Sequence, residues 1–241
     1  YRIADTGASL AAQLLIAVLP PAHYVSYNLL AILCCATLLP LMMTRASQPK
    51  MPAAARLRPR LAWRCSPLGV AGVLVAALSG ASFRMVGPIY GQEVGLAVDQ
   101  IAFFLAAFVL GGALAQYPMG WLADKFDRRW VLIWLSGVSI ISCAITLPAS
   151  SGGTGAIMLS AMLFGLTTVP IFSVSAAHAN DFATSEERVE LSAALMFFYA
   201  TGAIAAPLVA SALIEAFGPG ALFAFVAVGH AGLIAFGLAR M

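Results

Sequence analysis

The most specific group of charged side chains lies at residues 120–129, here called the charged loop: Gly-Trp-Leu-Ala-Asp-Lys-Phe-Asp-Arg-Arg, set between two long apolar runs. Gly120 has no side chain, so a neighbouring helix can approach closely there. The Asp124 carboxylate can face the positive end of another helix, and Arg128 and Arg129 add positive charge. The chemistry expected is electrostatic contact between segments. The alternative is that the loop only sets the orientation of the chain, although orientation alone does not require an aspartate among the basic residues.

A second candidate is Arg84, which lies inside the apolar run at residues 67–90. A charge well inside a membrane span costs at least ~2.5 kcal/mol on insertion scales and is a functional candidate by default. Two interpretations stay open. The side chain either extends to the outer interface, with Glu93 or Asp99 as its partner, or faces a cavity and binds an anionic group.

The residue patterns of enzymes and metal sites do not occur in the sequence. There is no His-Glu-x-x-His, no Gly-x-Ser-x-Gly and no pair of intramembrane aspartates. The 4 cysteines and 3 histidines are scattered, without metal-like spacing. We therefore expect no enzyme activity, no catalytic residue, no metal site and no cofactor.

The composition predicts that these residues are carried by membrane helices. Hydrophobic residues make up 61% of the chain and charged residues 10%, and the mean hydropathy is +0.93. A bilayer core about 30 Å thick requires roughly 20 apolar residues per helical span, and the alternation expected of barrel strands is absent. Eight runs qualify, at residues 3–19, 25–44, 67–90, 101–122, 130–148, 156–177, 188–213 and 220–240.

The basic residues predict the orientation of these spans, because they stay preferentially on the cytoplasmic side. Placing the connection at residues 45–66 inside puts twelve of the thirteen Lys and Arg residues on that side. The thirteenth is Arg84, within a span. The turn at residues 178–190 would also lie inside.

That inner turn carries Thr184 and, three residues later, Glu187. This spacing predicts a capping box at the start of the following span. His178, Asn180 and Asp181 could form a cluster at an inner gate, but a structural role of the turn is the favoured interpretation.

The layout of the spans predicts three parts and a longer protein. Tyr1 opens almost directly onto an apolar run without an initiator Met, so we expect a piece of a protein built from two six-span halves. Residues 1–44 would be the last two spans of the N-terminal half, residues 45–66 a basic cytoplasmic linker, and residues 67–241 the C-terminal six-helix half.

The charged loop resembles the cytoplasmic signature of the major facilitator superfamily, Gly-x-x-x-Asp-(Arg/Lys)-x-Gly-Arg-(Arg/Lys). Five positions match the signature: Gly120, Asp124, Lys125, Arg128 and Arg129. Asp127 stands where the family usually has Gly. In weaker form the signature follows the eighth span, the place that residues 101–122 take if the first span here is the fifth.

The resemblance implies an all-α integral membrane bundle with about eight of twelve helices in this chain. It also implies that the matching residues form a conformational latch on the cytoplasmic side, with Asp124 facing the start of the fifth span near Arg2. Such a latch would open when the two halves rock in alternating access.

Other polar and helix-breaking residues are candidates for the substrate pathway. Polar side chains within the spans could line a cavity or hydrogen-bond between helices: Gln116, Tyr117, Ser173, Ser175 and Tyr199. Pro88, Gly202 and Pro207 could bend helices or admit a close neighbour, and Pro118 and Pro170 invite the same interpretation.

The predicted function is that of a secondary transporter in a bacterial cytoplasmic (inner) membrane. It would move a small solute, with Arg84 favouring an anionic or polar one, and could use H+ or Na+ as coupling ion. No carboxylate lies near the middle of a span, so a proton relay would belong to the missing spans. The alternative is a transport-inactive receptor or scaffold on the same fold. The expected partners are the solute and the lipid bilayer, and no nucleic acid.

Overall fold

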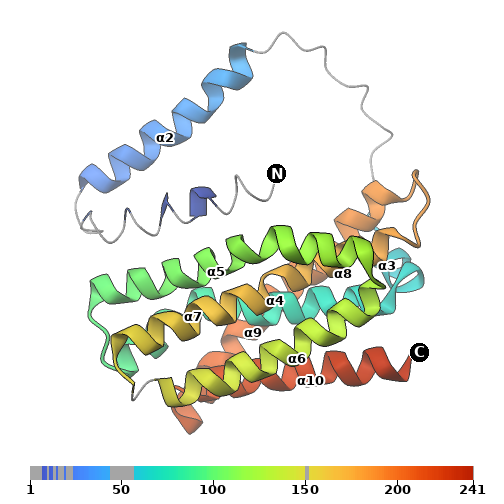
Figure 1. Ribbon diagram of the computed structural model, residues 1–241. Coiled ribbons are helices and arrows are strands. Elements are labelled where there is room, and N and C mark those ends of the chain that lie inside the picture. Colours follow the sequence, from blue (N-terminus) through green and yellow to red (C-terminus); the bar gives the residue numbers. More distant parts are fainter. Residues whose placement is uncertain are drawn as a thin grey trace.

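The computed structural model describes residues 24–43, 57–149 and 152–240, together with residues 7–9, 11, 12, 15 and 19. Within these ranges the regular structure is helical (Figure 1). The helices are α2 (Tyr24–Met43), α3 (Pro59–Cys65), α4 (Pro67–Glu93), α5 (Val98–Lys125), α6 (Arg128–Ala149), α7 (Thr154–Thr168), α8 (Pro170–Asn180), α9 (Arg188–Phe217) and α10 (Ala221–Ala239).

Six segments in the described part of the chain are long and apolar enough to cross a membrane: α4, α5, α6, α7 together with α8, α9 and α10. They confirm the six spans predicted between residues 67 and 240. α2 is apolar over Tyr24–Leu39 and coincides with the predicted span at 25–44. Arg2 and most of the predicted span at 3–19 lie outside the described residues.

One confirmed span lacks a backbone hydrogen bond near its middle. Residues 154–180 form a single candidate span, in which α7 ends at Thr168, α8 begins at Pro170, and Val169 between them keeps helical dihedral angles. Proline has no N–H to bond the carbonyl of Leu166, and its ring crowds that carbonyl. Pro170 is preferred in the first turn of α8 for the same reason, since an N–H is not needed there.

A short helix lies in the segment that the sequence predicts to be a linker. α3 occupies residues 59–65 of the predicted 45–66 connection and begins with Pro59. Leu61 and Ala62 are buried against a cluster that includes Leu191 and Ala194 of α9. The hydrophobic pair thus gives this end of the connection a packing surface, which a count of basic residues does not reveal.

The six spans lie side by side, with α3 and the C-terminal end of α10 at the same end of the bundle (Figure 1). We call this end, which carries the charged loop, the basic end. α4 packs against α8, α9 and α10, while α5 packs against α7 and α6 against α10.

Glycines bring α5 and α7 into backbone contact. A Cβ atom on Gly111 would overlap the carbonyl oxygen of Met162, and one on Gly165 would overlap that of Phe108. Helices in lipid gain little by burying apolar side chains against each other, so close approach at small residues has to supply packing energy.

Aromatic rings fill the bundle toward the end opposite the basic end. Phe83 of α4 stacks on Phe108 at 4.4 Å between ring centroids and lies 4.9 Å from Phe104 and 5.1 Å from Phe164. Rings of α4, α5 and α7 therefore form one rigid core, to which α10 adds Phe223.

The crossing of α5 and α7 gives a stability prediction. Gly165→Ala should push the two helices apart, because overpacking typically costs about 1–3 kcal/mol, and the midpoint of thermal unfolding in detergent should fall. Gly155→Ala, on the same helix where a Cβ meets no atom within 4 Å, should leave the midpoint unchanged or raise it. Equal midpoints for the two variants would contradict the close crossing.

Candidate functional site

The charged loop joins α5 to α6 at the basic end. α5 ends at Lys125 and α6 begins at Arg128. The Asp127 carboxylate accepts a hydrogen bond from the backbone N–H of Arg129 at 2.9 Å, as a helix-capping side chain does. The residue that departs from the family signature thus caps the start of α6.

Arg128 connects three helix ends in this loop. Its Nη2 donates to the Asp124 carboxylate at the end of α5, at 3.0 Å. Its Nη1 donates to the Asp181 carboxylate and, at 3.3 Å, to the carbonyl oxygen of Ala177 in α8. The Arg128 side chain is only 22% exposed, so these charge-assisted bonds are partly shielded from water.

Asp124 keeps a free surface despite this ion pair. The sequence predicts that it faces the fifth span near Arg2, and Arg2 lies outside the described residues. Among the described residues its ionic partner is Arg128, and its side chain remains 76% exposed. A Cβ on Gly120, one turn earlier, would meet no atom within 4 Å. Gly120 and Asp124 therefore share an open face of α5.

The two other basic residues of the signature have separate environments. The Lys125 ammonium lies 4.8 Å from the centroid of the Trp121 ring, a cation–π arrangement. Arg129 has a buried Nε atom without a hydrogen-bond partner in the described part of the chain.

A second set of ion pairs at the basic end ties α3 to the start of α9. Arg58 lies 2.9 Å from Glu190 and Arg64 lies 2.6 Å from Glu187. The two hydrogen bonds of the predicted capping box form: the backbone N–H of Thr184 donates to the Glu187 carboxylate at 3.3 Å, and the N–H of Glu187 donates to the Thr184 hydroxyl at 3.3 Å. They close the turn before α9, whose N-cap is Glu187 and not Thr184 as predicted. α9 begins just after it, at Arg188.

These contacts act on the Glu187 carboxyl. Its pKa is lowered from the usual value, first because the Thr184 amide donates to it, and further by the Thr184 hydroxyl and Arg64. Glu187 is thus held in the charged form that Arg64 requires.

The three residues of the suggested gate cluster each make a separate side-chain contact. Asp181 pairs with Arg128, the Asn180 side chain donates to the Ala176 carbonyl at 2.8 Å, and the His178 ring packs against Phe182. Sequence reasoning missed the pairing of this acidic turn with Arg58, Arg64 and Arg128. The available signal was that acidic residues concentrate between 181 and 190, on the predicted side of the basic residues.

Arg84 is exposed and faces a hollow of about 200 Å³. The hollow is lined by Ser9 and Ala12 of the N-terminal segment and by three residues of α5: Leu105, Phe108 and Val109. No ion pair joins Arg84 to an acidic residue in the described ranges, and the proposed partners Glu93 and Asp99 are among the residues described.

The other pathway candidates are not brought together in one cluster. Gln116 accepts a hydrogen bond from the Ser173 hydroxyl at 3.3 Å, so it links α5 to α8. Tyr117 is 82% exposed and points away from the bundle core. Tyr199 packs edge-on against Phe172 at 5.2 Å.

The predicted helix-breaking residues do not end their helices. Pro88 lies within α4 and Pro207 within α9. Gly202 admits a close neighbour, since a Cβ there would lie 2.9 Å from that of Ala77 in α4.

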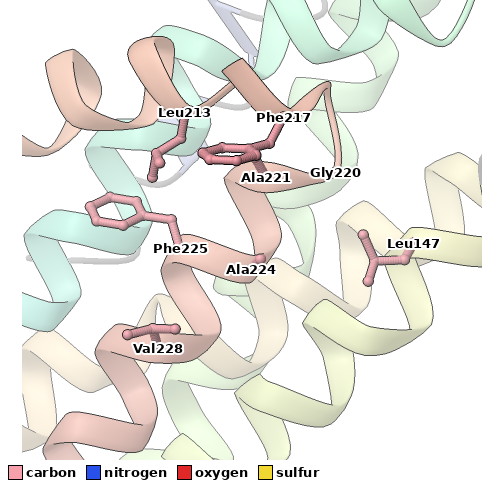
Figure 2. A pocket seen from close by; sticks show the side chains of 8 residues that line it. All are labelled: Leu147, Leu213, Phe217, Gly220, Ala221, Ala224, Phe225 and Val228. Carbon is pink, nitrogen blue, oxygen red and sulfur yellow. The ribbon is translucent and has the colours of Figure 1, made fainter. Parts of the chain in front are cut away.

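A larger hollow of about 570 Å³ lies at the end of the bundle opposite the basic end, between α6, α9 and α10 (Figure 2). Its side chains are apolar and include Leu147, Phe217 and Phe225. Without a polar group in its lining, this hollow offers nothing to orient a polar solute.

The described residues contain no group of three or more His, Cys, Asp or Glu residues that could hold a metal ion. His230 is wholly buried, with Nε2 3.0 Å from the Ser79 hydroxyl, and joins α10 to α4.

The bundle, the charged loop and the isolated intramembrane cation together define a multi-pass integral membrane protein with charges gathered at one end.

The chain belongs to the major facilitator superfamily, whose family model matches residues 69–240. Among curated proteins, the "Uncharacterized MFS-type transporter YcaD" of Salmonella paratyphi B is 29% identical over 200 residues, which are 80% of this chain and 50% of that protein. The protein of the same name from Salmonella dublin is 28% identical over the same extent. The chain thus spans about half the length of the curated relatives it matches.

The Arg128 contacts give a prediction for the charged loop. Arg128→Ala leaves Asp124 and Asp181 without their ion pairs, so we expect a loss of roughly 1 kcal/mol or more of stability and a lower thermal midpoint in detergent. Arg129→Ala removes a neighbouring charge that makes no ion pair in the described residues, and should cost less. High salt should shrink the difference between the variants. An Arg128→Ala midpoint equal to that of Arg129→Ala would show that the ion pairs contribute nothing.

Proposed function

We propose that the protein is a secondary transporter that moves a small solute across a bacterial cytoplasmic membrane by alternating access of two helical halves. The observation that carries this proposal is the family match over the six-helix bundle of residues 69–240. The transporter names and bacterial sources of the relatives support it.

In this proposal residues 67–241 are the C-terminal half, residues 1–44 end the N-terminal half, and residues 45–66 link the two. α9 supports the presence of a second half. Only 28% of its most apolar window is buried within the bundle, against 67% for α4. A helix so little covered has a broad face left for lipid or for the other half.

The charged loop would act as the latch of the basic end. The open face formed by Gly120 and the exposed carboxylate of Asp124 could receive the positive end of a helix from the other half, near Arg2. Arg128 would hold Asp124 in place from behind, and Lys125 and Arg129 would add to the positive potential. The contact would form when the basic end is closed and break when it opens.

The solute pathway would run along the faces of α4, α5, α8 and α9 that carry Arg84, Gln116, Tyr117 and Tyr199. Arg84 favours an anionic solute, because no acidic residue in the described part of the chain supplies a counter-charge to its guanidinium inside the span. Pro88, Gly202 and Pro207 are the proposed points of bending. The coupling ion would be H+ or Na+, with its site in the other half.

Transport is tested with the full protein in proteoliposomes. Uptake of a panel of labelled organic anions and cations should show saturable, protein-dependent flux for at least one anion, and Arg84→Ala should reduce that flux by an order of magnitude or more, as loss of a charge-assisted contact predicts. Arg84→Lys should retain part of it. Equal flux through all three proteins would remove Arg84 from the pathway, and the absence of flux for every solute would favour a receptor or scaffold.

The latch is tested by a charge-neutral substitution. Asp124→Asn should open the basic end and so increase labelling, by a membrane-impermeant maleimide, of a cysteine introduced by Gly120→Cys in a protein without native cysteines. Asp181→Asn is the matched control, because it also removes one ion pair of Arg128 but belongs to the end of α8, whereas the open face belongs to α5. Equal labelling in the two variants would contradict the latch.

A further inference from the structure

We propose that Arg84 and Tyr199, which lie on either side of the small residue Gly80, form a binding site for a small oxyanion between α4 and α9. This inference rests on the proposed transport function and names the substrate class of its pathway. The ligand would be a carboxylate or a phosphate, since both present oxygens to a guanidinium.

Gly80 lies one helical turn from Arg84. Residues four apart share a face of a helix, with about 6 Å between them. The face of α4 that carries the unpaired cation therefore also carries a residue without a side chain. Arg84 is exposed and Gly80 is partly exposed, so this face is not sealed by the described part of the bundle.

The packing of α4 does not require glycine at position 80. A Cβ there would meet a single atom within 4 Å, the Tyr199 hydroxyl oxygen, at 3.9 Å, which is ordinary contact. At Gly72 on the same helix, by contrast, a Cβ would collide with the Ser175 side chain. Alanine is also the better helix former. Gly72 is thus explained by helix packing, whereas Gly80 leaves open space in front of a hydroxyl group.

Tyr199 supplies a hydrogen-bond donor at that space. Its ring is held edge-on by Phe172 at 5.2 Å, while its hydroxyl makes no hydrogen bond to any other described residue. A phenol O–H can donate to an oxyanion. A ligand lying over Gly80 would meet the guanidinium on one side and this hydroxyl on the other.

The site lies at a suitable depth. Position 80 is the middle residue of the 27-residue helix α4, and transporter sites lie near the middle of the bilayer. A snorkelling arginine would instead pair with lipid phosphate at the outer interface. Both sources offer the same oxyanion chemistry, so the experiment has to separate a soluble anion from a lipid headgroup.

The experiment uses the full protein in proteoliposomes with Cys34, Cys35, Cys65 and Cys143 replaced by serine, and with Gly80→Cys introduced. Modification rates are compared for an anionic and a cationic methanethiosulfonate reagent. One positive charge about 6 Å away in water should make the anionic reagent faster by about tenfold, relative to a free thiol in solution. Arg84→Gln should abolish this preference.

Two further measurements identify the ligand and provide a control. Succinate or inorganic phosphate, at matched ionic strength against chloride, should slow the anionic reagent, and Tyr199→Phe should weaken this protection. Gly232→Cys on α10, an exposed position where a Cβ meets no atom within 4 Å, is the control and should react slowly, because we expect this position to face lipid.

The proposal is overturned if Gly80→Cys reacts no faster than Gly232→Cys, if the charge preference survives Arg84→Gln, or if phosphatidylglycerol protects in place of the soluble anions. These readouts need no transport. If labelling is charge-selective and is slowed by soluble anions but no flux is found, the binding site is retained and the transporter function is rejected. If flux is found without such labelling, the transporter function is retained and the binding site is rejected.

Discussion

The close crossing of α5 and α7 is the contact on which the rest of this bundle depends. Water is absent from the hydrocarbon core, so apolar burial between helices contributes little there and backbone approach must replace it. Gly111 and Gly165 let two backbones touch. Once α5 and α7 are fixed, Phe104, Phe108 and Phe164 surround Phe83 of α4. Arg84 follows Phe83 directly in the chain, so the aromatic core also fixes where the intramembrane cation emerges.

The basic end is held together by charge as well as by packing. Arg128 gathers the ends of α5 and α8 at the start of α6, and Arg58 and Arg64 hold α3 against the start of α9. The acidic partners come from the ends of two helices and the turn at residues 181–190. Three arginines from two connections, Arg58, Arg64 and Arg128, thus find acidic partners at this end.

The sequence was sufficient to predict the spans and the family, because each span must carry its own apolar run and the signature is local. The six spans from residue 67 onward and the loop at 120–129 were therefore found. Contacts between residues that are distant in the sequence could not be predicted in this way. Asp181 pairs with Arg128 across 53 residues, and α3 forms because Leu61 and Ala62 find a surface on α9. The sequence contains several prolines within the spans. It does not show that Pro170 begins α8 while Pro88 and Pro207 remain inside their helices.

The interruption between α7 and α8 has a mechanical consequence. Pro170 cannot bond the Leu166 carbonyl, so the two half-helices are joined by a backbone with fewer restraints than an unbroken rod. The first half-helix is bound to α5 by glycine contacts, and the second is bound to α6 through Arg128. The two half-helices thus differ in these contacts, although the hydrogen bond from Ser173 to Gln116 also joins α8 to α5. With one backbone hydrogen bond missing at residue 170, the α7–α8 span resists bending least at this point, and a bend there would move Asp181 relative to the half-helix that is bound to α5.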